Sequence, residues 1–375
     1  MNDPTTTPRY DLERLLVSGS PRAMGRAQGE HWRDRIRAFL DVRFAAVSGY
    51  CTERGRASGA SGLLEVGAES MGIAEAWDAV GMAEHRGIAE GAGVDVTRLY
   101  TATNMTDLRD VLLLPDVSLL PDAPLPPADA EGCSAVLVPA ARAADGHAIA
   151  GQTWDLNATD VDFVVAVHRR PDEGPESWSV SCVGCLTLMG FNARGLAVGT
   201  TNIKTRDARP GAGYLSVLHR LARCASVDEA EAVFATAPLA GAHTYWMADA
   251  ERQVEWEASP SARVARDTAG GPICRTNHCI SDAHAAMQGE PTSDSSAQRF
   301  EVLAAALSAD QVSVDDVRAL FGDRSRGVLS VNRYPEDAQG TATNACFVAV
   351  PALRRLHACR GPADRGVWHT LGFAG

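Results

Sequence analysis

The chain has 375 residues, 45% of them hydrophobic and 22% charged, which is typical of a globular protein with one large domain or two smaller ones. Its formal net charge of −12 argues against a nucleic-acid partner, because phosphate binding needs concentrated lysine and arginine. The N-terminus lacks a signal-peptide pattern and no apolar run is long enough to span a membrane, so we expect a cytoplasmic protein with no membrane partner.

The first third of the chain shows helical patterns. Ser20 and Pro21 form a good helix start, with serine as the cap and proline at the first helical position. Apolar residues then recur at helical spacing, interrupted by glycine-rich stretches that predict loops. In chain order we expect a strand and a helix within 11–52, a loop at 53–67, a helix near 73–88, a break at 87–93 and a short helix near 96–103.

A proline-rich stretch, 114–131, divides the chain. Its five prolines exclude a helix or a central strand, so it is the most plausible linker. It ends at Gly132 and Cys133, and an apolar strand pattern begins directly afterwards. We therefore expect an upstream helical segment, 1–132, and a downstream catalytic segment, 133–375.

Strand patterns dominate the beginning of the downstream segment. Short apolar runs separated by turn signals predict six strands between 134 and 201, and a hairpin turn is expected near 248–252. Helices are expected near 213–224, 227–236, 297–308 and 313–321, and closing strands near 345–350, 354–359 and 367–371. This alternation of strand and helix groups indicates an α+β protein with two sheets between helical layers.

Gly132 and Cys133 suggest a specific chemistry. A thiol can attack a neighbouring carbonyl when the backbone is held in an unfavourable conformation, which glycine tolerates. An N-to-S acyl shift followed by hydrolysis would make Cys133 a new N-terminus, and its α-amine, with a pKa of about 8, can act as the base. By itself the Gly-Cys-Ser triplet is weak evidence, because cysteine is commonly a small buried hydrophobic residue.

Several further motifs occur in an order and at separations that are fairly specific. They are Gly87 to Gly93, Gly132-Cys133-Ser134, Gly151-Gln152-Thr153-Trp154-Asp155, Thr276-Asn277-His278 and Ala358-Cys359-Arg360-Gly361-Pro362. Together they resemble the autoproteolytic acyltransferase and hydrolase family typified by the acyltransferase of penicillin biosynthesis, within the N-terminal nucleophile hydrolases. The resemblance covers nearly the whole chain.

The resemblance implies a four-layer αββα N-terminal nucleophile hydrolase sandwich. It also implies self-cleavage between Gly132 and Cys133, after which the two pieces remain associated as an α/β heterodimer. The expected partner is a small-molecule amide substrate, and no cofactor and no metal are expected.

Three residues of the resemblance are candidate catalytic residues. Cys133 carries over as the nucleophile, with its new α-amine as the general base. Asp155 is expected to position it or to hold the α-ammonium, although a turn-forming aspartate that caps Asn157 is the alternative. Asn277 is expected to donate to the oxyanion, and a loop asparagine is the alternative. His278 is expected to be structural or pocket-lining, because a nucleophile with its own amine needs no histidine.

Four residues are candidate substrate contacts. Ser134 follows the nucleophile directly. The family has a small hydroxyl residue near the last sheet, a place that either Thr341 or Thr343 can fill. Arg360 resembles an arginine just before Gly-Pro in the family, and a surface ion pair is the alternative. Ala135 stands where the penicillin enzyme has a hydroxyl, so that enzyme's substrate is not carried over.

Three functional classes fit the sequence. The first is a self-processing cysteine amidohydrolase or N-acyltransferase that works through a thioester, with hydrolysis slightly preferred because no coenzyme A loop is recognisable. The second is an uncleaved, non-catalytic ligand-binding protein on the same fold. The third is a metal or thiol-redox protein that uses its cysteine-rich segments. The pair Cys182 and Cys185 lies in strand material without a second pair at zinc spacing, so structural thiols are expected there.

Overall fold

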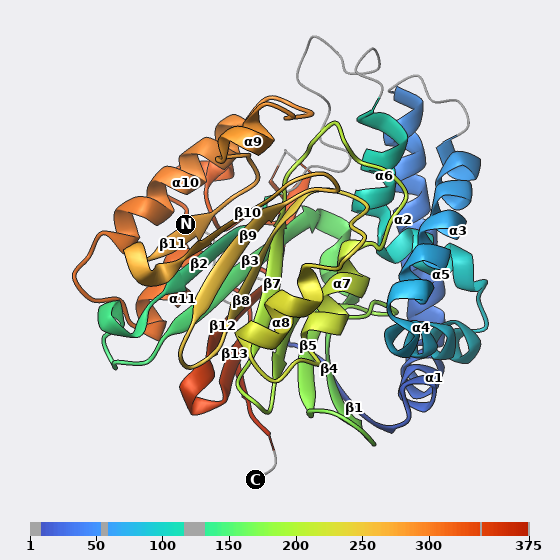
Figure 1. The fold of residues 1–375 in the computed structure, drawn as a ribbon, viewed down its shortest axis with the longest axis horizontal. Coiled ribbons are helices and arrows are strands. Elements are labelled where there is room, and N and C mark those ends of the chain that lie inside the picture. The colour runs from blue at the N-terminus through green and yellow to red at the C-terminus, as the bar shows by residue number, and fades with distance from the viewer. Residues whose placement is uncertain (1–8, 54–58, 116–131, 338–339, 374–375) are drawn as a thin grey trace.

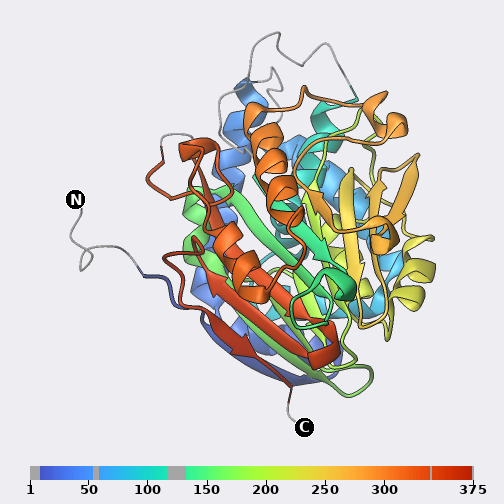
Figure 2. The same cartoon turned by 90° about the vertical axis from the view of Figure 1, so that its left-hand side faces the viewer.

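The computed structural model describes residues 9–53, 59–115, 132–337 and 340–373. Two sheets lie face to face in the middle of the molecule, with helices on both outer sides (Figure 1). The view turned by 90° shows helices of the C-terminal third crossing one outer face (Figure 2). Most of the predicted linker, 116–131, lies outside the described residues.

Both sheets are largely antiparallel. The eight-stranded sheet contains, in spatial order, β1 (Arg14–Gly19), β4 (Val164–Pro171), β5 (Ser177–Cys182), β6 (Met189–Asn192), β7 (Ala197–Asn202), β8 (His243–Ala248), β9 (Gln253–Ala258) and β10 (Arg263–Asp267). The six-stranded sheet contains β11 (Ile273–Arg275), β2 (Ser134–Val138), β3 (Ile149–Asn157), β12 (Thr341–Val350), β13 (Arg355–Arg360) and β14 (His369–Leu371).

The helices form the two outer layers. On the six-stranded sheet lie α10 (Asp294–Leu307) and α11 (Val314–Phe321), and on the eight-stranded sheet lie α7 (Tyr214–Leu221) and α8 (Val227–Phe234). The second layer is extended by α1 (Pro21–His31), α2 (Arg33–Glu53), α3 (Gly59–Trp77), α4 (Ala79–Ala92), α5 (Val96–Thr103) and α6 (Met105–Leu113), and a short α9 (Asp282–Ala285) precedes α10. This arrangement confirms the predicted α+β class and its αββα layers.

The upstream segment is built into the downstream sheet. Its strand β1 pairs in parallel with β4 and forms one edge of the eight-stranded sheet. A buried ion pair and a buried hydrogen bond also join the two segments: Glu84 Oε1 lies 2.6 Å from Arg169 Nε, and Asp107 Oδ1 lies 2.6 Å from His243 Nε2. The upstream segment is therefore held by the main-chain hydrogen bonds of β1 and by side-chain contacts that water cannot reach.

The break predicted at 87–93 is wrong. Helix α4 continues through it and stops before Gly93, whose φ of 64° lies in the left-handed region that glycine favours. Gly87 and Gly91 instead allow α4 to approach α1 closely, because a Cβ at Gly87 would lie 2.2 Å from the main-chain oxygen of Arg22. The glycines serve helix packing rather than a turn.

The loop predicted at 53–67 is wrong over 59–67, where α3 begins. Two strands were not predicted, β10 and β11, because one is largely solvent-exposed and the other has only three residues. No helix in the described part of the chain combines the length and the apolarity needed to cross a membrane.

Candidate active site

Cys133 lies at the entrance to β2. The antiparallel register pairs Ser134 with Thr153, which sets Gly132 beside Asp155, and the N–H of Gly132 donates to the main-chain oxygen of Asp155 at 3.2 Å. The Cys133 thiol points to the same oxygen, with Sγ 3.7 Å away. The sheet thus brings together the predicted nucleophile and the predicted aspartate, which are 22 positions apart.

The side chains of Cys133 and Asp155 face opposite sides of the six-stranded sheet. Cys133, Ala135 and Trp154 belong to the core between the sheets, whereas Val136 belongs to the core beneath α10 and α11. Because successive side chains of a strand alternate between faces, the Asp155 carboxylate lies on the helix side. Their contact therefore runs through the main chain of Asp155.

Asp155 is completely buried. Thr343 Oγ1 donates to its Oδ2 at 3.1 Å, and Arg333 Nε lies 3.8 Å from the same oxygen. Among the described residues, its Oδ1 has no hydrogen-bond partner. Burial raises the pKa of Asp155 to about 6, although the charges of Arg333 and Arg299 act in the opposite direction. This carboxylate can therefore change its charge at a physiological pH.

Arg299, which the sequence analysis did not identify, connects the site. Its guanidinium donates to the main-chain oxygen of Cys133, to Ser134 Oγ at 3.0 Å and to Asn277 Oδ1 at 2.9 Å. The side chain is fully buried on α10, and burial together with the charge of Arg333 lowers its pKa to about 9. One planar cation thus fixes three groups at once.

Arg333 is a second buried arginine that the sequence analysis did not identify. It donates to Thr341 Oγ1 at 2.9 Å and to Ser295 Oγ, and its guanidinium lies against Gly132. Burial lowers the pKa of Arg333, while the Asp155 carboxylate acts to raise it. The buried cluster around the Gly132–Cys133 bond therefore contains two guanidinium groups and one carboxyl group.

Asn277 is held in a fixed orientation. Its Nδ2 donates to the main-chain oxygen of Asn202 at 3.0 Å, its main-chain N–H donates to Ser296 Oγ at 2.9 Å, and its Oδ1 accepts from Arg299. The structure therefore connects Asn277 to Cys133 through Arg299.

Three of the four candidate substrate contacts lie in this cluster. Ser134 accepts from Arg299, Thr343 donates to Asp155 and Thr341 accepts from Arg333, so both threonines that the sequence left open are present. Arg360 lies apart from them: it contacts Asp162 Oδ1 at 3.5 Å and the ring of Tyr10 at 5.7 Å.

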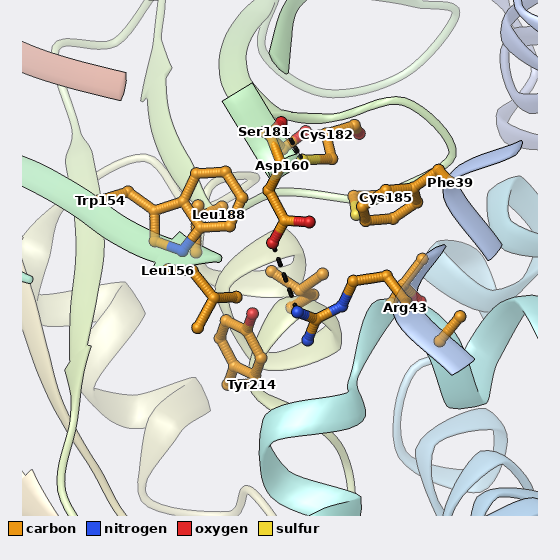
Figure 3. Close-up of a pocket in the computed structure, with 13 residues that line it drawn as sticks. Phe39, Arg43, Trp154, Leu156, Asp160, Ser181, Cys182, Cys185, Leu188 and Tyr214 are labelled. Carbon is orange, nitrogen blue, oxygen red and sulfur yellow. Dashed lines mark hydrogen bonds and ion pairs between the residues drawn. The ribbon is translucent and has the colours of Figure 1, made fainter. Parts of the chain in front are cut away.

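A small cavity lies on the inter-sheet side of β3. Continuing the β2–β3 register sets Cys133 opposite Trp154, whose indole lines the cavity. Arg43 from α2, Asp160 and Tyr214 from α7 line this cavity. Figure 3 shows Arg43 pointing towards Asp160, and Arg43 Nη1 and Asp160 Oδ2 are 3.3 Å apart. About 10 Å³ is open to the centre of a water-sized sphere, which is room for one water molecule. Both segments of the chain line this cavity.

Among the described residues, no group of three histidine, cysteine, aspartate or glutamate side chains could hold a metal ion. Cys182 and Cys185 are buried thiols, and burial raises the pKa of Cys185 to about 12. His278 Nδ1 lies 2.9 Å from Ser296 Oγ, and its ring packs edge-on against Phe300.

Solved structures resemble parts of the chain. Penicillin V acylase from Agrobacterium tumefaciens is 14% identical, with a TM-score of 0.42 over 61% of this chain and 83% of that chain. A mutant of conjugated bile acid hydrolase from Clostridium perfringens is 11% identical, with a TM-score of 0.45 over 64% of this chain and 97% of that chain. Among curated proteins, none is significantly similar in sequence.

A family model matches more than half of the chain. It spans residues 142–363, which include Asp155, Asn277, Arg299 and Arg333, and it begins after Cys133. Its description is acyl-coenzyme A:6-aminopenicillanic acid acyl-transferase. The chain therefore belongs to this acyltransferase family.

Proposed function

We propose that the protein is a self-processing cysteine amidohydrolase or acyltransferase that acts on a small amide. The observation that carries this proposal is the position of the Gly132–Cys133 peptide bond. It lies beside the main-chain oxygen of Asp155 and two buried arginines, Arg299 and Arg333. Membership of the family supports the reaction class, and this geometry supports the residues assigned to it.

Self-cleavage would begin with attack of Cys133 Sγ on the carbonyl carbon of Gly132. The C–N bond breaks, the thiol proton passes to the departing nitrogen, and a thioester joins Gly132 to Sγ. Water then attacks the thioester, which leaves a carboxylate on Gly132 and restores the thiol. The products are residues 1–132 and 133–375, and the parallel pairing of β1 with β4 supports their remaining together as an α/β heterodimer.

Catalysis would use the new N-terminus. The α-amine of Cys133 takes the thiol proton, Sγ attacks the substrate carbonyl, and the amine product leaves with that proton. The Nδ2 of Asn277 is the proposed donor to the oxyanion, because its orientation is fixed by Arg299 and Ser296. Water or a second amine then takes the acyl group from the thioester.

Asp155 is the proposed partner of the α-ammonium group that cleavage creates. Its Oδ1 has no hydrogen-bond partner among the described residues, and its main-chain oxygen is already next to Cys133. A cation at the new N-terminus would stabilise the ionised carboxylate and lower the pKa of Asp155 from its raised value of about 6. Cleavage would thus supply a cationic hydrogen-bond donor for Asp155 Oδ1.

The cavity beside Trp154 is the proposed substrate-binding region. Its lining is mainly apolar and aromatic, with the buried Arg43–Asp160 ion pair as a polar element. Hydrolysis is preferred over transfer to an amine, because water is always present as the acyl acceptor.

The test is to compare intact masses and amidase activity of purified wild-type protein and cysteine variants. Cys133→Ala should leave one full-length chain without activity, and Cys133→Ser should cleave slowly, because a hydroxyl is a poorer nucleophile than a thiol. Cys224→Ala is the matched control, since this cysteine is also buried but contacts Arg220. The same two fragments from Cys133→Ala would rule out self-cleavage by this thiol. A folded, uncleaved wild type would favour the non-catalytic alternative.

A further inference from the structure

Gly132 leaves no space for a side chain. A Cβ built at this position would lie 2.4 Å from Arg333 Nη1, 2.7 Å from Arg333 Cζ and 3.0 Å from Asp155 Cβ. Contacts between carbon atoms are normally about 3.5–4 Å, so each of these distances is a steric conflict. The conflict concerns only the L-configured substituent of the α-carbon.

Arg333 is not able to give way easily. Its side chain is 3% exposed, and its two terminal nitrogens donate to Thr341 Oγ1 and Ser295 Oγ. Moving the guanidinium would break charge-assisted hydrogen bonds in a site that water does not reach. Asp155 Cβ is fixed by the strand β3. The space beside the Gly132 α-carbon is therefore closed by rigid groups.

This step rests on the proposed function. If that function holds, the space beside the Gly132 α-carbon also receives the acyl group of a substrate. In the self-cleavage thioester, the carbonyl carbon of Gly132 is bonded to Cys133 Sγ. In the thioester formed from a substrate, the acyl carbonyl carbon has the same bond to the same sulfur. The α-carbon of the acyl group then occupies the position of the Gly132 α-carbon, against Arg333.

We infer that the enzyme excludes acyl groups with an L-configured substituent on the α-carbon and accepts those of the form R–CH2–CO–, and that Arg333 is the specificity-determining residue. The R group takes the direction of the Gly132 nitrogen, whose N–H donates to the main-chain oxygen of Asp155. We therefore expect the enzyme to bind acyl groups whose R group begins with a hydrogen-bond donor, as in N-acylglycyl amides. An L-α-methyl group, as in N-acyl-L-alanyl amides, is rejected.

The self-cleavage rate tests this inference without a known substrate. The rate is measured for Gly132 and Gly132→Ala precursors in two backgrounds, wild type and Arg333→Lys, and the Gly/Ala rate ratio is compared between backgrounds. Lysine keeps the charge and removes Nη1, the atom nearest to the added Cβ, while its Nζ takes the place of Cζ at the end of the side chain. The ratio should be about 10- to 100-fold with Arg333, as for other overpacked sites, and several-fold smaller with lysine.

The ratio cancels any general loss of activity or stability that Arg333→Lys causes. An equal ratio in the two backgrounds, or Gly132→Ala cleavage at the wild-type rate, would overturn the inference while leaving self-processing intact. A wild-type precursor that never cleaves would overturn both. For the mature enzyme, the matched probes are N-acetylglycyl and N-acetyl-L-alanyl 4-nitroanilides. A higher kcat/KM for the alanyl compound would contradict the inference.

Discussion

Arg299 donates a hydrogen bond to the main-chain oxygen of Cys133, a residue 166 positions earlier in the chain. The same guanidinium donates to Oδ1 of Asn277, so the proposed nucleophile and the proposed oxyanion donor are held by one group. A planar fork with several N–H donors is required for this, and a lysine ammonium lacks that geometry.

Arg299→Lys is therefore expected to slow self-cleavage by about 10- to 100-fold, because it keeps the charge but loses part of the fork. The measurement is the half-time for appearance of the fragment that begins at Cys133. Arg26→Lys is the control, since Arg26 is exposed and pairs with the neighbouring Glu30 on α1. Equal half-times for Arg299→Lys and the control would remove Arg299 from the mechanism.

Asp155→Asn should change how stability depends on pH. Burial raises the pKa of Asp155 to about 6, above the value of 3.8 for an exposed aspartate. The folded chain therefore binds this proton more tightly than the unfolded chain, and the free energy of unfolding falls as pH rises from about 4 to 6. A shift of this size corresponds to on the order of 3 kcal/mol at most.

The cleaved form complicates this titration, so the measurement uses the Cys133→Ala precursor with and without Asp155→Asn. Denaturant unfolding at several pH values should show that the stability of the parent relative to the asparagine variant falls as pH rises from about 4 to 6. Asp34→Asn, an exposed position, should keep the parent profile. Parallel profiles for parent and Asp155→Asn would show that the buried carboxyl does not titrate in this range.

Glu84→Gln should destabilise the protein strongly. Burial alone would raise the pKa of Glu84, but the charges of Arg169 and His219 hold it at about 2. The ionised carboxylate thus contributes stability above about pH 4.5, and this contribution is lost as pH falls towards 2. Removing it leaves Arg169 buried without its partner, at a cost of about 3–5 kcal/mol near neutral pH.

The control for Glu84→Gln is Glu90→Gln on the same helix, α4. Glu90 pairs with Arg22 on the surface, and such pairs contribute little to stability. Thermal unfolding of the two variants should therefore differ clearly. If both midpoints matched that of the parent, the buried ion pair between the segments would not be important for stability.

Helix α1 offers a test of close packing. A Cβ at Gly29 would lie 2.2 Å from the main-chain oxygen of Ile88, so Gly29→Ala should separate α1 from α4 and cost about 1–3 kcal/mol. Gly72 in α3 has no atom within 4 Å of such a Cβ, so Gly72→Ala should instead stabilise by about 0.5–1 kcal/mol. Denaturant midpoints provide the comparison, and stabilisation by both substitutions would refute the packing argument.

The elements that a sequence pattern marks strongly were predictable. The helices α10 and α11 and the hairpin of β8 and β9 follow apolar spacing and turn residues, and the structure has them at these places. The predicted break at 87–93 was wrong because a sequence does not distinguish a glycine that allows two helices to pack closely from a glycine that ends a helix. Only the neighbouring helix distinguishes the two cases.

The site residues that lie within sequence motifs were predictable. Those that come from distant parts of the chain, Arg299 and Arg333, were not predicted. Arg299 did leave a signal, because it shares the buried face of α10 with Ser296, Leu303 and Leu307 at helical spacing. An arginine on that face implies a buried partner. Arg333 lies outside any helix or strand, so its role depends entirely on the folded arrangement.

The measurement that tests the central claim most directly is the intact mass of freshly purified wild-type protein under denaturing conditions, with N-terminal sequencing of each fragment. The account predicts two pieces of roughly 14 and 26 kDa, in proportion to their lengths, and the larger piece begins Cys-Ser-Ala-Val. A single chain of 39.7 kDa that stays intact on incubation would contradict it.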